Sequence, residues 1–112
     1  MTDDTLIHVT DSTFEAEVIH SQLPVMVDFY ADWCAPCRVA EPILLDLSKK
    51  FLGRVKFTKV NVDESNQVSQ SFGIHSIPTY LFVDQGREKG RELGIVAPTE
   101  FRSVLLRYFD FK

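Results

Sequence analysis

A nearly continuous apolar run that leads directly into two cysteines is the feature that most constrains the fold of this chain. Residues 25–31 read Val-Met-Val-Asp-Phe-Tyr-Ala, a composition typical of a strand that is covered on both faces. Residues 39–51 carry apolar side chains at four-residue spacing, which predicts a helix with one buried stripe. The sequence therefore predicts a strand that passes into a helix, with Cys34 and Cys37 at the junction.

The position of the two cysteines predicts a reactive dithiol. A thiol at a helix N-terminus lies beside unpaired backbone N–H groups and the positive end of the helix dipole, and both favour the thiolate. Residues three apart in a helix have Cα atoms about 5 Å apart, within the range that a disulfide tolerates. Cys34 and Cys37 are the only cysteines in the chain. A disulfide across so short a loop would restrict the unfolded chain by only about 2 kcal/mol, which favours a redox role over a structural one.

Charge and composition limit the partners that we expect. The chain has 112 residues, which suits one domain spanning residues 1–112. The formal net charge of -4 gives no reason to expect nucleic acid or an anionic membrane surface as a partner. The first four residues are polar and acidic, unlike a secretory signal, and no apolar stretch reaches membrane-spanning length. Together with the redox role of the two cysteines, these features predict a cytoplasmic protein without a membrane partner. We also expect it to be a monomer.

The spacing of apolar residues along the chain predicts its strands and helices. Strands are expected at residues 5–9, 25–31, 55–62, 79–83 and 88–93, with a hairpin turn at 84–86. Helices are expected to begin at residue 12, directly after Cys34, within residues 63–66 and at Pro98. This order predicts an α/β fold with a single mixed five-stranded sheet and helices on both faces.

Local signals mark the expected helix ends. Ser12 and Glu15 fit a capping box that would begin the first helix. Pro42 is expected to kink the helix that follows Cys34, and Gly53 is expected to end it. Pro98 suits the first turn of the last helix.

Several segments resemble the thioredoxin family. The segment Val-Asp-Phe-Tyr-Ala-Asp-Trp-Cys-Ala-Pro-Cys at residues 27–37 resembles the family's active-site segment, and Gly-Ile-His-Ser-Ile-Pro-Thr at residues 73–79 resembles its cis-proline loop. The remaining matches are two short segments and two glycines, namely residues 42–43, residues 59–63, Gly86 and Gly94. The resemblance covers nearly the whole chain. It implies a thioredoxin fold and the activity of a protein-disulfide reductase.

A few positions depart from the family pattern. Ala35 stands where glycine is commonest between the two cysteines, and Tyr30 stands where tryptophan is usual. His75 and Ser76 precede the Ile-Pro pair, and His75 is either a solvated loop histidine or a residue that tunes Cys34. These differences bear on the redox potential and on partner preference, while the expected reaction type stays the same.

Thiol–disulfide exchange assigns a role to each candidate catalytic residue. Cys34, nearer to the helix start and more exposed, is expected to attack a substrate disulfide, and Cys37 to resolve the mixed disulfide. Asp28 lies within the apolar strand, so we expect it to be buried and to accept the proton of Cys37. Lys59 is expected to share the covered face with Phe57 and to modulate the charge of Asp28. The alternative is a lysine whose ammonium group simply reaches solvent.

The expected substrate surface surrounds the dithiol. Trp33 would shield the cysteines and offer a flat apolar contact to a substrate. The resemblance implies a cis peptide bond before Pro78 and docking of the substrate backbone along this loop. The expected binding residues are Trp33, Ala35, Pro36, Ile77, Pro78 and Gly94.

Other functions stay open on the sequence alone. A structural zinc site needs four ligands, and the histidines His8, His20 and His75 lack the paired spacing of a zinc finger, so we expect no metal. The same fold could serve as an oxidant or isomerase, or as a binding subunit or chaperone with incidental cysteines. No bound cofactor is expected because the dithiol carries the electrons. By resemblance, the partners are disulfide-containing substrate proteins and a flavin-dependent thioredoxin reductase.

Overall fold

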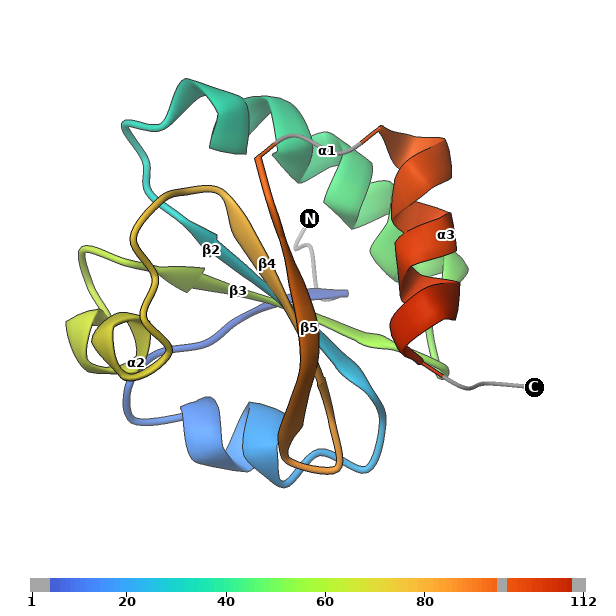
Figure 1. Cartoon of the computed structure of the whole chain (residues 1–112), viewed down its shortest axis with the longest axis horizontal. Helices are drawn as coiled ribbons and strands as arrows, with labels where there is room; N and C mark the ends of the chain where they lie inside the picture. Colours follow the sequence, from blue (N-terminus) through green and yellow to red (C-terminus); the bar gives the residue numbers. More distant parts are fainter. Residues whose placement is uncertain (1–4, 95–96, 110–112) are drawn as a thin grey trace.

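A five-stranded mixed sheet forms the centre of the computed structural model, which describes residues 5–94 and 97–109. The strand order is β1-β3-β2-β4-β5 (Figure 1). β3 is parallel to both β1 and β2, whereas β4 is antiparallel to β2 and β5 is antiparallel to β4. The strands are β1 Leu6–His8, β2 Val25–Tyr30, β3 Lys56–Asn61, β4 Thr79–Asp84 and β5 Arg87–Leu93. The predicted α/β architecture is confirmed.

Helices cover both faces of this sheet, as the sequence predicts. The helical segments are η1 Glu15–Ile19, α1 Ala35–Lys50, α2 Asn66–Ser71 and α3 Pro98–Tyr108. α1 and α3 pack on one face, and η1 and α2 pack on the other (Figure 1). Within β2, Met26 contributes to the first of these two cores, while Val27 and Phe29 contribute to the second. The run of apolar residues in β2 follows from this double coverage.

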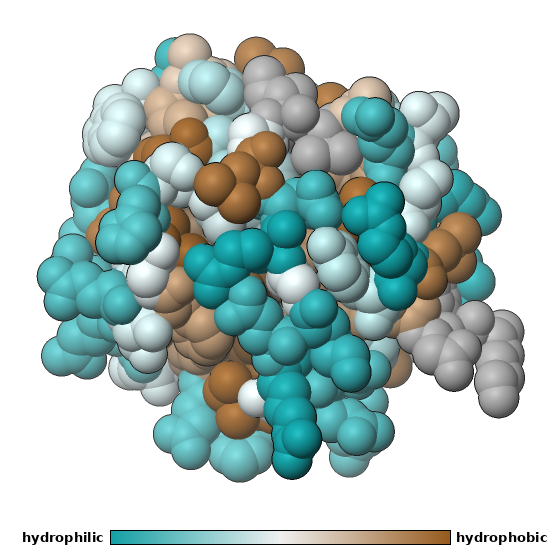
Figure 2. Space-filling model, in the orientation of Figure 1, coloured by the Kyte–Doolittle hydropathy of each residue, from teal (hydrophilic) through white to brown (hydrophobic). Residues whose placement is uncertain are grey.

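The charged strand β5 lies at the edge of the sheet. Hydrophilic side chains follow it across the visible face of the molecule (Figure 2). Charges along an edge strand discourage pairing with a second chain. The hairpin between β4 and β5 is also confirmed, because Gln85 and Gly86 adopt the positive φ angles of 53° and 78° that a tight hairpin turn requires.

The first helical segment begins differently from the expected capping box. The Glu15 carboxylate contacts His20 Nε2 at 3.3 Å, and η1 has no side-chain cap. Thr10 organises this turn instead, since its N–H donates to Thr13 Oγ1 at 2.9 Å and its carbonyl accepts from the Phe14 N–H at 2.9 Å. The prediction that Ser12 and Glu15 form the cap is therefore wrong, because the Thr13 hydroxyl accepts the backbone N–H of Thr10 instead.

The junction of β2 and α1 places the cysteines at one end of the sheet. α1 begins at Ala35, immediately after Cys34, and Pro42 lies within it. Phe51 ends α1, and Gly53 follows in the next turn with a φ of 85°. Because β4 is antiparallel to β2, the start of β4 lies beside the end of β2, so residue 78 comes close to the cysteines. No helix in the described part of the chain is long and apolar enough to cross a membrane.

Candidate active site

The two cysteines form a disulfide at the N-terminus of α1. Cys34 is the N-cap residue, and its sulfur accepts the Cys37 N–H at 3.3 Å. The two Cα atoms are 5.2 Å apart, in agreement with the spacing expected for a helical turn. The helix N-terminus therefore stabilises negative charge at the Cys34 sulfur, which makes this sulfur the better nucleophile and leaving group.

The oxidised dithiol is less accessible than the sequence predicts. Cys34 is 5% exposed and Cys37 is 3% exposed, so both are buried. They form a small apolar cluster with Ala31, against which Tyr30 and Ile77 pack. The expectation of an exposed Cys34 is wrong for this redox form, because side chains from the end of β2 and from the loop before β4 pack against the cysteines. The order of the two exposures agrees with the expectation.

Trp33 borders a groove beside the dithiol. Its side chain is exposed, and its indole N–H donates to Asp63 Oδ2 at 2.8 Å. A cavity of about 210 Å³ lies next to it and is lined also by His75 and Ile77. His75 is exposed at this rim. Asp63 was not among the residues expected at the site, since its only signal in the sequence is an acidic residue just after the strand β3.

The other expected binding residues gather at the same end of the sheet. The Ile77–Pro78 peptide bond is cis, as the resemblance implies. The Gly94 N–H donates to the Pro78 carbonyl at 2.9 Å, so the end of β5 lies beside this loop. Ala35 and Pro36 are exposed in the first turn of α1 between the cysteines. Chain segments as far apart in sequence as Ala35 and Gly94 thus form one surface around the disulfide.

Asp28 is buried in the central strand behind the disulfide. It is 3% exposed, and none of the described residues donates a hydrogen bond to its Oδ1. Burial raises the pKa of this carboxyl from 3.8 to about 7, with a further increase from the charge of Glu41 and an opposing effect from Lys59. A cavity of about 200 Å³ is lined by Asp28, Cys37 and Glu41. The expectation of a buried acid near Cys37 is confirmed.

Lys59 lies on the expected face but has an unexpected partner. It pairs in register with Asp28, while its ammonium group bonds Glu41 Oε2 at 3.1 Å and lies 5.4 Å from the centre of the Tyr30 ring. Burial lowers the pKa of Lys59, but the hydrogen bond and the negative charge of Glu41 outweigh it, and the net direction is upward. Glu41 was not among the residues expected at the site, since a charged residue on a helix is usually solvated.

The described part of the chain contains no group of three His, Cys, Asp or Glu side chains that could hold a metal ion. The disulfide and its neighbours define the chemistry of this end of the sheet. They are a sulfur pair at a helix start, a proton-binding carboxyl behind it and an apolar groove in front. Such a site can exchange disulfides with another thiol-containing molecule.

Comparison with known proteins agrees with this chemistry. Residues 5–106 match the family model described as Thioredoxin. The chain is 44% identical over 88 residues to "Thioredoxin" of Rickettsia felis, covering 79% of this chain and 84% of that protein. It is 41% identical over 100 residues to "Thioredoxin 1" of Nostoc sp. and 35% identical over 100 residues to "Thioredoxin" of Haemophilus influenzae, covering 89% of this chain and 94% of each relative. The chain therefore belongs to the thioredoxin family and is a protein thiol–disulfide oxidoreductase.

Proposed function

We propose that this oxidoreductase is a general cytoplasmic reductase of protein disulfides, which works as a monomer of one domain and is recharged by a flavin-dependent thioredoxin reductase. The observation that carries this proposal is the Cys34–Cys37 disulfide at the start of α1, beside an open apolar groove. No bound cofactor is needed in this scheme, since the two sulfurs carry both electrons.

The proposed reaction begins with the reduced dithiol. The Cys34 thiolate attacks one sulfur of a substrate disulfide, so a mixed disulfide forms and the second substrate sulfur leaves as a thiolate. Cys37 then loses its proton and attacks Cys34, which releases the first substrate sulfur. Two electrons pass to the substrate, and the Cys34–Cys37 disulfide is left for the reductase to reduce again.

Asp28 is our candidate for the acceptor of the Cys37 proton. Both residues line the same cavity, and a carboxyl with a pKa of about 7 matches a proton transfer at neutral pH. Lys59 would modulate the charge of Asp28 from the neighbouring strand.

The substrate would bind across the front of the site. Trp33 and Ile77 would contact its apolar side chains, and the backbone before Pro78 would pair with an extended segment of the substrate. Ala35, Pro36 and Gly94 would complete this surface.

A reduction assay tests the proposed function. With dithiothreitol as the electron source, the protein should reduce the disulfides of insulin faster than dithiothreitol alone does. The variant Cys34→Ser/Cys37→Ser is the control and should lose the entire effect. Equal rates with and without the protein would contradict the reductase and favour a binding module.

Limiting iodoacetamide tests the roles of the two cysteines. In the reduced protein near neutral pH, Cys34 should be alkylated before Cys37, because its sulfur lies at the helix N-terminus. Mass spectrometry of the digested protein identifies the modified residue, and Cys34→Ser should react far more slowly. Earlier modification of Cys37 would reverse the proposed roles.

A further inference from the structure

The buried carboxyl of Asp28 faces a lysine that does not pair with it. Asp28 and Lys59 are register partners on the adjacent strands β2 and β3, so their side chains leave the sheet on the same face. This placement alone would favour an ion pair between them. Among the described residues, however, the structure shows no ion pair that joins Lys59 to Asp28, and Asp28 Oδ1 has no donor.

Glu41 on α1 holds the lysine instead. Its Oε2 lies 3.1 Å from Lys59 Nζ, and its side chain is 44% exposed while that of Lys59 is 23% exposed. Glu41 lines the same cavity as Asp28 and Cys37. The ammonium group is therefore held by the half-exposed Glu41 carboxylate and lies 5.4 Å from the centre of the Tyr30 ring, without an ion pair to the buried carboxyl of Asp28.

We propose that Glu41 is a positioning residue, which holds the Lys59 ammonium group in an ion pair of its own and thereby keeps Asp28 a strong proton acceptor. Lysine has a long flexible stem, so loss of the Glu41 charge would free its ammonium group to approach Asp28. A close cation would stabilise the Asp28 carboxylate and weaken it as a base. The catalytic part of this inference rests on the proposed role of Asp28, whereas the positioning of Lys59 does not.

Ionisable groups face Asp28 from every element around it. They are Lys59 on β3, Tyr30 on β2, Tyr80 on β4, Cys37, Arg38 and Glu41 on α1, and Asp32 between β2 and α1.

Several of these groups have a fixed protonation state or are already bonded to another residue. Burial raises the pKa of Tyr80, so its phenol stays neutral, and Cys37 is part of the disulfide in the oxidised form. The Arg38 guanidinium donates to the Asp32 carbonyl at 2.6 Å. α3 contributes the apolar ring of Phe101, which packs edge-on against Tyr80 at 5.1 Å. The position of Lys59 is therefore the variable that Glu41 can control.

Titration of Asp28 in the oxidised protein tests the proposal without substrate. The carboxyl carbon of Asp28, observed by NMR, reports its protonation as the pH is varied. In Glu41→Gln, the midpoint should fall by about 1 pH unit relative to the unchanged protein, because Lys59 is released toward Asp28 and the negative charge of Glu41 is lost. The matched control is Asp46→Asn, which removes one negative charge from the same helix, where Asp46 pairs with Lys50 at 3.1 Å. Equal midpoints in the two variants would overturn the proposal.

A double-mutant cycle separates positioning from direct repulsion. Lys59→Met should raise the Asp28 midpoint, since it removes the only cation that the sheet places in register with this carboxyl. In the Lys59→Met background, Glu41→Gln should lower the midpoint much less than it does alone. An equal decrease in both backgrounds would mean that Glu41 acts on Asp28 directly, and would overturn its role as a positioning residue.

The resolving step gives a second and separate readout. In single-turnover experiments, the pH at which this step reaches half its maximal rate should fall in Glu41→Gln by the same amount as the titration midpoint. The maximal rate should also decrease, because Asp28 becomes a weaker base. A shifted titration with an unchanged rate profile would overturn the catalytic half of the proposal, and with it the role of Asp28, while the positioning half would stand.

Discussion

At the scale of single residues, the main conflict lies at Asp28. An ionised carboxylate is costly to bury, and Asp28 lies between Val27 and Phe29 in the central strand with an exposed fraction of only 3%. The protein resolves this conflict by raising the pKa of the carboxyl to about 7, so the group is largely protonated below neutral pH. A residue that lowers stability in this way is typical of a functional site.

Asp28→Asn should therefore increase stability and slow the resolving step. As the pH rises above 3.8, the unfolded chain ionises while the folded protein keeps its proton, so the native protein loses stability until about pH 7 and the loss is constant above that. Asn removes this loss, and the gain at pH 8 should approach about 4 kcal/mol, with a smaller gain at pH 5. Urea denaturation at the two pH values measures the gain.

The same variant separates two explanations of Asp28. If the carboxyl is the proton acceptor, mixed disulfides between Cys34 and substrate should form at the usual rate and resolve more slowly. A variant that is less stable at pH 8 and resolves at the normal rate would mean that Asp28 is a satisfied acid without a role in proton transfer.

At the scale of elements, α1 makes the dithiol reactive. Cys34 caps the helix, the N–H of Cys37 points at its sulfur, and Pro36 occupies the first turn, where a missing N–H costs nothing. This local arrangement needs only the sequence of the junction. The helix start is also where this chain departs from the commonest family motif, at Ala35.

Ala35→Gly should change the redox potential only slightly. Alanine favours a helix over glycine by about 1 kcal/mol, and this preference acts on the reduced and the oxidised forms alike. The thioredoxin potential of about -270 mV serves as the reference, and a shift of at most about 30 mV is expected, equivalent to about 1.4 kcal/mol. Equilibration of the Cys34–Cys37 pair with glutathione measures the redox potentials of the unchanged protein and of Ala35→Gly. A value near about -120 mV for the unchanged protein would contradict the reductase and favour an oxidant.

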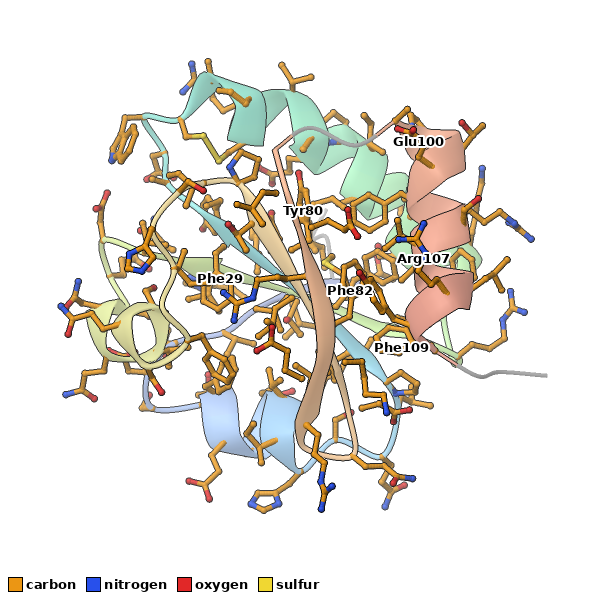
Figure 3. The ribbon with its side chains drawn as sticks, in the orientation of Figure 1. Phe29, Tyr80, Phe82, Glu100, Arg107 and Phe109 are labelled. Atoms are coloured by element: carbon orange, nitrogen blue, oxygen red, sulfur yellow. A yellow bond between two sulfur atoms is a disulfide. The ribbon has the colours of Figure 1, made fainter. Side chains whose placement is uncertain are left out.

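At the scale of the whole molecule, aromatic side chains join α3 to the sheet. Tyr80 and Phe82 of β4 lie on the side of the sheet that faces α3, opposite to Phe29 (Figure 3). The Tyr108 ring stacks on Phe82 at 5.0 Å and covers Gly90 of β5, where a Cβ atom would overlap it. This close approach of helix and edge strand closes one of the two cores.

Gly90→Ala should therefore lower stability by about 1 to 3 kcal/mol, since the added methyl group displaces the Tyr108 ring. Displacement would also strain the hydrogen bond that the Tyr108 hydroxyl donates to Glu92 at 2.9 Å. Urea denaturation measures the loss, and Tyr108→Ala provides the matched background. An equal loss in both backgrounds would show that the cost arises from the strand rather than from the ring.

The sequence by itself determined the features that depend on neighbours along the chain. The apolar run of residues 25–31, the cysteines and the following helix are contiguous, so periodicity and helix-end chemistry predicted the strand, the helix and the disulfide spacing. The burial of Asp28 followed from the same run, since a strand covered on both faces leaves no exposed position for its acid.

Only the tertiary structure decided the contacts between distant segments. Glu41 reaches Lys59 across 18 residues, and Trp33 donates to Asp63 across 30 residues, although no local pattern marks either partner. The packing of Ile77 against the cluster of Ala31 and the two cysteines likewise depends on how the antiparallel strand β4 returns to the end of β2. These contacts control access to the disulfide and the charge around Asp28, because burial and electrostatics depend on distances through space, which spacing along the chain does not determine.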